Sequence, residues 1–129
     1  MLLAARYADW WNLSDASIET YQARLNILQH HCEAIGRQFS TIRKTYFGRL
    51  VLAGTQVEAR ALAMEQGRSH YDGWTPDGAL VGTPEQVVEQ IQPFLDIGVD
   101  YFIVEILNIA SPDVQQMVVE EVLPHVQAS

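Results

Sequence analysis

The stretch Gly82–Leu107, GTPEQVVEQIQPFLDIGVDYFIVEIL, decides the fold because it encodes one complete helix followed by one strand. Thr83 is a good N-cap, Pro84 suits the first helical position, and Gln86 completes a T-x-x-Q capping box. Gly98 is placed to end the helix in a left-handed conformation. Between them runs one apolar stripe at helical spacing: Val87, Val88, Ile91, Phe94 and Leu95.

The segment after Gly98, Val99–Leu107, is a nearly continuous apolar run in which Asp100 and Glu105 are the only charges. A strand with one solvated face alternates between apolar and polar residues. A continuous run instead predicts a strand covered on both faces, as in parallel α/β sheets. A buried helix is the alternative, but the Gly stop before the run and the new cap after it favour a strand.

The chain is acidic, with 16 Asp and Glu against 8 Lys and Arg and a formal net charge of −8. This balance argues against nucleic acid or an anionic membrane as a general partner. A single cysteine, Cys32, forms no internal disulfide, and no apolar run approaches the roughly 20 residues of a membrane span. Met1–Ala5 lacks the apolar core of a signal peptide. We therefore expect a cytoplasmic protein.

The first half of the chain predicts two helices and two strands. Residues 1–8 have helical composition without a cap before them, which indicates that the chain begins within a larger unit. Tyr7–Asn12 fits a short strand that opens into a loop, and Ile42–Ala53 is a second strand in which Gly48 suggests a bulge or a bend. Between them lies the clearest helical stripe, which Gly36 ends: Ile18, Tyr21, Leu25, Leu28, Cys32 and Ile35.

The second half adds a helix over Thr55–Gln66, with apolar residues Val57, Ala61, Leu62 and Met64 and a stop at Gly67. Residues 67–82 read as the longest loop. Ser111, Pro112 and Asp113 open a last helix. Helices alternating with strands are typical of parallel α/β folds, so we expect a single α/β domain over residues 1–129. Three parallel strands are few for such a sheet, which therefore looks like part of a larger sheet or barrel.

Six motifs appear in a familiar order: AARYADWWN, HCEAIGR, IRKTYF, VGTPEQVVEQI, DIGVDYFIVEI and EEVLPHV. In this order they resemble the C-terminal part of the bacterial luciferase-like monooxygenase family, and most of all its deazaflavin-dependent oxidoreductase branch. The resemblance runs from Leu3 to Val126. It implies a partial TIM barrel, the C-terminal segment of an eight-stranded β/α barrel.

The resemblance also implies an FMN or deazaflavin cofactor and a hydride-transferring oxidoreductase or monooxygenase that acts on a small molecule. The chain would supply the last three strands: Tyr7–Asn12, Ile42–Ala53 and Val99–Leu107. The Gly-rich turn that holds the cofactor phosphate, and most of the catalytic strands, would lie upstream of Met1. Partners implied are the missing N-terminal half of the barrel or further copies of the chain in a homo-oligomer.

Chemistry in barrels sits at the carboxyl ends of strands, and on the predicted strand bounds Trp10 and Asn12 lie at such an end. We expect these two residues to face a planar cofactor, because an indole supplies apolar surface and an amide can form hydrogen bonds with the edge of a ring. The alternative is that the tryptophans only pack. Glu105 is expected to pair with Arg43 or Lys44, or else to be a buried acid. No catalytic residue is identified.

His30, His31 and Cys32 suggest a metal site, but adjacent helical residues diverge by about 100° and cannot converge on one ion. We therefore expect no metal, and Cys32 in the core. Four residues of the predicted long loop are candidates for a lid or an interface, with a solvated loop as the alternative: His70, Tyr71, Asp72 and Trp74.

Two functional hypotheses remain open. The first is a flavin- or deazaflavin-dependent oxidoreductase, present as a segment that lacks full activity alone. The second is a non-catalytic α/β module that self-associates through open sheet edges.

Overall fold

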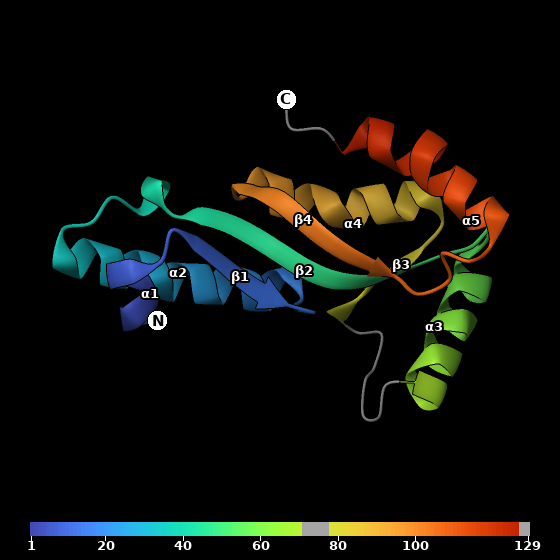
Figure 1. The fold of residues 1–129 in the computed structure, drawn as a ribbon, viewed down its shortest axis with the longest axis horizontal. Helices are drawn as coiled ribbons and strands as arrows, with labels where there is room; N and C mark the ends of the chain where they lie inside the picture. Colours follow the sequence, from blue (N-terminus) through green and yellow to red (C-terminus); the bar gives the residue numbers. More distant parts are fainter. Residues whose placement is uncertain (71–77, 127–129) are drawn as a thin grey trace.

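The computed structural model describes residues 1–70 and 78–126, without the side chains of residues 68–70. Strands alternate with helices along the chain, as predicted (Figure 1). In order, the main elements are α1 (Leu2–Tyr7), β1 (Trp10–Ser14), α2 (Ile18–Ile35), β2 (Arg43–Leu52), α3 (Gln56–His70), β3 (Leu80–Gly82), α4 (Pro84–Asp96), β4 (Val99–Ile106) and α5 (Pro112–Met117). A π-helical turn (Val118–Val122) and a 3-10 turn (Leu123–His125) follow α5.

The four strands form one parallel sheet with β2 at its centre (Figure 1). β4 pairs with β2 along one side, from Lys44 to Leu50. On the other side, β1 pairs with the first half of β2 and β3 pairs with its last three residues. The fold class is therefore α/β, as expected, with one more strand than the sequence indicated. The additional strand, β3, lies within the predicted long loop.

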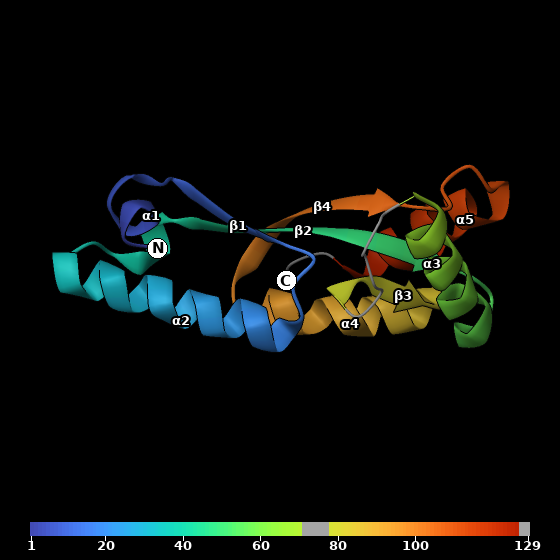
Figure 2. The same cartoon turned by 90° about the horizontal axis from the view of Figure 1, so that it is seen from below.

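Helices α2 and α4 cover the same face of the sheet (Figure 2), here called the packed face. α2 begins at Ser17, whose hydroxyl accepts a hydrogen bond from the Thr20 amide, and ends at Gly36 with φ +74°. Its stripe buries four of the six predicted residues, while Ile18 is half-buried and Ile35 exposed. The core contains side chains from the sheet and from both helices, including Trp11, Tyr21, Leu28, Tyr46, Leu52, Val87, Ile91 and Phe94.

The helix predicted first, α4, is confirmed in detail. Thr83 and Gln86 form both hydrogen bonds of the capping box, and Pro84 is the first helical residue. The chain leaves the helix through Gly98, whose φ of +101° disfavours any other residue. Val87, Ile91 and Phe94 are buried against the sheet.

The opposite face of the sheet, here called the open face, corrects the prediction that both faces of β4 are covered. Tyr101 and Ile103 on β4 are 43% and 48% exposed. α3 packs on this side of the sheet only near the carboxyl ends of β2 and β3, where a small buried cluster contains Val51, Val81 and Ala59. A continuous apolar run therefore did not mean burial on both sides.

Two local predictions are also wrong. β1 runs from Trp10 to Ser14 rather than from Tyr7 to Asn12. The register shift in the sheet lies at Lys44/Thr45, not at Gly48. Gly48 instead leaves room for the Tyr46 ring, which a Cβ at this position would overlap.

The fourth correction concerns α3, which continues past the expected stop at Gly67 to His70. Ala59, Ala63 and Gly67 are buried at every fourth position, while the predicted apolar residues Val57, Ala61, Leu62 and Met64 are exposed. The helix thus packs through its smallest side chains, and Gly67 belongs to that close-packed stripe.

Candidate functional site

All four strands run in the same direction, and β2, β3 and β4 end close together at one end of the sheet, while β1 ends beside the middle of β2 (Figure 1). On the open face this end carries one polar cluster, formed by Asp15, Arg49 and Glu105. Asp15 directly follows β1, Arg49 lies on β2, and Glu105 lies on β4. The parallel register places Arg49 opposite Glu105.

Arg49 is the centre of this cluster. Its Nη1 pairs with the Asp15 carboxylate, and its Nε lies 3.6 Å from Glu105 Oε2. The Arg49 backbone N–H also donates to Asp15 Oδ1 at 3.2 Å. The guanidinium is mostly buried, while the Glu105 carboxylate is 43% exposed. The arrangement fixes a cation between two carboxylates, one of which remains accessible to a ligand.

Asp15 holds an unusual backbone conformation at this end of β1. Its φ is +50°, in the left-handed region that only a few non-glycine residues adopt. The Asp15 amide donates to Phe47 O at 2.9 Å, and this bond and the Arg49 contacts hold the turn. A side chain on Gly78 would overlap the Asp15 carbonyl, so the backbone just before β3 packs directly against this turn.

Asn108 stabilises the neighbouring strand end. Its Nδ2 donates to Leu52 O at 2.6 Å, and its Oδ1 accepts from Leu52 N at 3.5 Å. The amide therefore continues the β2–β4 pairing beyond the last residue of β4. Asn108 directly follows the predicted strand Val99–Leu107, but the sequence alone did not reveal this role.

The predicted cofactor residues Trp10 and Asn12 both lie on the open face, but Trp10 is at the amino end of β1. Its ring lies 5.3 Å from the Tyr101 ring and 5.1 Å from the Arg43 guanidinium. Asn12, in the middle of β1, accepts a 3.0 Å hydrogen bond from the Thr45 hydroxyl. The strand end on which their selection rested is wrong by two residues, since β1 ends at Ser14. Their contact with a cofactor stays a prediction.

The expected ion pair of Glu105 exists, but its partner is Arg49 rather than Arg43 or Lys44. Arg43 pairs with Asp100 at 3.5 Å. Lys44 donates to Phe39 O at 2.9 Å, and its burial lowers the pKa of its ammonium group. Only the strand register reveals these pairings, because no sequence spacing brings position 49 beside position 105.

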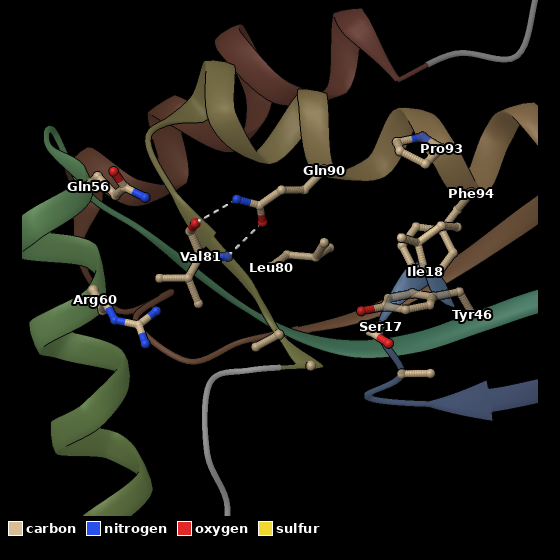
Figure 3. Close-up of a pocket in the computed structure, with 13 residues that line it drawn as sticks. Ser17, Ile18, Tyr46, Gln56, Arg60, Leu80, Val81, Gln90, Pro93 and Phe94 are labelled. Atoms are coloured by element: carbon tan, nitrogen blue, oxygen red, sulfur yellow. Dashed lines mark hydrogen bonds between the residues drawn. The ribbon is translucent and has the colours of Figure 1, made fainter. Parts of the chain in front are cut away.

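A lateral cavity of about 390 Å³ opens beside the junction of β1 and β3 (Figure 3). Gln56 and Arg60 of α3 lie on one side of it, and Tyr46 and Phe94 lie on the other. Gln90 closes part of its wall through hydrogen bonds to Val81 N and Val81 O of 3.0 and 2.9 Å. Burial, and to a lesser extent the Asp15 charge, raises the pKa of Tyr46 to about 12, so its hydroxyl stays neutral. The cavity combines apolar walls with a few polar groups, as small-molecule sites do.

Among the described residues, no three His, Cys, Asp or Glu side chains are placed to hold a metal ion. Cys32 is buried in the core, as predicted. Tyr71, Asp72 and Trp74 of the proposed lid, and the side chain of His70, lie outside the described residues.

Within the part of the chain that the structure describes, no helix has the length and apolar character needed to cross a membrane.

No protein-family model matches the chain, and no curated protein matches it. Several solved structures do. An F420-dependent secondary alcohol dehydrogenase in complex with an F420-acetone adduct superposes with a TM-score of 0.70 at 17% identity, over 98% of this chain and 45% of that one. Riboflavin lyase with modified FMN and riboflavin gives 0.68 at 17% identity, over 95% and 39%. The coenzyme F420 dependent tetrahydromethanopterin reductase from Methanopyrus kandleri gives 0.67 at 15% identity, over 98% and 48%.

The chain thus spans less than half the length of these three structures. Identities this low establish a shared fold and no more. At that level the fold expected from the sequence is confirmed: the chain has the fold of part of a β/α barrel.

Proposed function

We propose that this chain is a segment of a flavin- or deazaflavin-dependent oxidoreductase and contributes part of the cofactor-binding wall. The observation that supports this most directly is the polar cluster of Asp15, Arg49 and Glu105. It lies on the open face at the carboxyl ends of parallel strands, where barrel enzymes place their chemistry. The similar structures named above include two F420-dependent enzymes and a riboflavin lyase with modified FMN.

The open face fits the ring system of such a cofactor. Tyr101 and Ile103 present a half-exposed apolar surface between the polar cluster and Trp10. Asn12 offers an amide N–H₂ for a ring carbonyl, since its oxygen already accepts from Thr45. The fit does not extend to the cofactor phosphate, because the two arginines of this face, Arg43 and Arg49, are both paired with carboxylates. We therefore assign only ring contacts to this chain.

The bound ring would supply the hydride chemistry. The chain's own residues would position the ring and shield it from water. The carboxylate of Glu105, held by Arg49, can accept an N–H from the edge of a ring, and the apolar side chains exclude water from its face.

The test is a fluorescence titration of the purified chain with FMN and, separately, with the deazaflavin coenzyme. We expect saturable binding with a Kd on the order of micromolar. Asn12→Ala and Arg49→Gln should weaken it about tenfold or more, since a hydrogen bond to the ring and the orientation of Glu105 are lost. Asn26→Ala and Arg24→Gln are matched controls, because both residues are exposed on α2, far from the open face.

The proposal fails if a folded sample, verified by circular dichroism, binds neither cofactor. It also fails if the control substitutions weaken binding as much as the open-face substitutions do.

A second candidate function is self-association without catalysis. It is favoured by the exposed apolar side chains around β4, Tyr101 and Ile103 among them. The mass of the chain in solution tests it.

A further inference from the structure

The lateral cavity of about 390 Å³ lies where the sheet is interrupted. β1 ends at Ser14, opposite Phe47 of β2, and β3 begins at Leu80, opposite Leu50. Pairing along this edge of β2 therefore stops between the two strands. The cavity lies beside this interruption, between α3 and the two helices of the packed face (Figure 3). Its volume is within the range of small-molecule sites.

Tyr46 provides the polar group that distinguishes this cavity from a packing defect. Its side chain is only 1% exposed, and its ring contacts the rings of Phe94 and Phe102 at 4.7 and 5.7 Å. A side chain at Gly48 would overlap the Tyr46 hydroxyl, so the position of the ring depends on that glycine. The hydroxyl points into the cavity (Figure 3), and none of the described residues forms a hydrogen bond with it. A buried hydroxyl without a partner costs stability, which a bound acceptor would restore.

The neighbouring polar groups of the wall are already bonded. The Ser17 hydroxyl accepts from Thr20 N at 3.2 Å and donates to Thr20 Oγ1 at 3.1 Å. The Gln90 amide bonds both Val81 N and Val81 O. On this side of the cavity, the Tyr46 hydroxyl is therefore the donor that remains for a ligand.

We propose that the cavity binds a small uncharged molecule with an apolar body and one carbonyl or hydroxyl oxygen, which accepts a hydrogen bond from the Tyr46 hydroxyl. The apolar body would lie against Ile18, Leu80 and Phe94, which line the cavity. Because burial raises the pKa of Tyr46 to about 12, its hydroxyl keeps its proton and donates at neutral pH. The nearby Asp15 charge also raises this pKa, and the same charge disfavours an anionic ligand at the hydroxyl.

The cavity would persist within a larger sheet. Gln90 occupies the N–H and the C=O of Val81, so a further strand cannot pair with β3 at this position. The site is also separate from the proposed cofactor contacts, because Asn12, Tyr101 and the polar cluster lie on the open face. A ligand in the cavity and a cofactor ring on the open face therefore do not compete.

The experiment measures the binding of three aromatic probes to the full chain by ligand-observed NMR titration: acetophenone, ethylbenzene and benzoate. We expect acetophenone to bind saturably. Tyr46→Phe should weaken acetophenone binding about threefold to tenfold, because one hydrogen bond is lost while the ring remains. Ethylbenzene has no acceptor oxygen, so its affinity should not fall in Tyr46→Phe. Comparing the two probes in the two chains isolates the hydrogen bond.

Tyr21→Phe is the matched control. This phenol is also buried on the packed face, but it donates to Thr45 O at 2.7 Å and does not line the cavity. Its removal should leave acetophenone binding unchanged, and circular dichroism should show both variants folded. In the original chain, intermolecular nuclear Overhauser effects from acetophenone to the methyl groups of Ile18 and Leu80 should place the probe in the cavity without any substitution.

The proposal is overturned if acetophenone does not bind, or if Tyr46→Phe weakens it no more than Tyr21→Phe does. Overhauser effects to other methyl groups, with none to Ile18 or Leu80, also contradict it. Tighter binding of benzoate than of acetophenone would identify an anion site beside Arg60 instead. The cofactor titration depends on Asn12 and Arg49, which do not line the cavity, so a failed cavity and a failed cofactor site are told apart.

Discussion

The two faces of the sheet are built from the same strands but have different surroundings. On the packed face, Tyr46, Phe94 and Phe102 form a network of ring contacts with centroid separations of 4.7 to 6.4 Å. On the open face, Trp10 and Tyr101 contact each other while remaining largely exposed. Aromatic residues on one face thus contribute to folding, and those on the other are available for binding. The residue types alone do not distinguish them.

The polar groups follow the same division. On the packed face, the Tyr21 hydroxyl donates to Thr45 O at 2.7 Å within the core. On the open face, charged side chains pair at both ends of the sheet, Arg43 with Asp100 and Arg49 with Asp15 and Glu105. A face that is to contact a ligand or a partner keeps charges at its rim and apolar groups between them.

The largest expected contrast comes from truncating one ring on each face. Phe94→Ala removes a buried ring that contacts Tyr21, Tyr46 and Phe102, and should lower the free energy of unfolding by about 3–5 kcal/mol. Tyr101→Ala on the open face should cost no more than about 1 kcal/mol. Urea denaturation measures both. Equal losses would remove the distinction between the faces. If Phe94→Ala does not fold, Phe94→Leu should still cost more than Tyr101→Ala.

An alkaline titration tests the packed face through its buried phenols. Burial raises the pKa of Tyr46 from 10 to about 12, and burial, helped by the Asp100 charge, raises the pKa of Tyr21 further. The folded chain then holds protons that the unfolded chain has lost, so stability present below pH 10 declines as the pH rises from 10 toward 12. The slope should be at most about 1.4 kcal/mol per pH unit for each tyrosine.

Thermal melts across this range provide the measurement. Tyr46→Phe should reduce the alkaline decline. The lowered pKa of Lys44 acts with the opposite sign and only below the ordinary lysine pKa of 10.5. A decline that persists undiminished in Tyr46→Phe would contradict the assignment.

The smallest contrast separates the two ends of the open face. Arg49→Gln leaves Asp15 and Glu105 without their shared cation in a mostly buried position, and should cost about 1–2 kcal/mol of stability. Arg43→Gln breaks a pair whose side chains are about half exposed, and should cost less than about 1 kcal/mol. Chemical denaturation of the two variants decides this. If Arg43→Gln is the more damaging, the structural centre of the open face lies at the amino ends of the strands instead.

Local signals in the sequence predicted the elements that depend on neighbouring residues. The capping box at Thr83, the glycine stops at Gly36 and Gly98, and the stripe of α2 were correct because each acts within a few residues. The parallel α/β class followed from their alternation. The bounds of β1 and α3 were missed, since the position where pairing with β2 begins and the burial of Gly67 depend on distant partners.

What the sequence by itself determined is therefore the helices, their caps and the alternation that makes a parallel sheet. The tertiary structure decided which face of each strand is covered and which charges meet. Arg49 meets Glu105 only because β2 and β4 pair in a particular register. The long apolar run of β4 is exposed on the open face because both covering helices, α2 and α4, lie on the packed face. Local patterns fix backbone conformation, whereas burial and ion pairing depend on residues brought together from far along the chain.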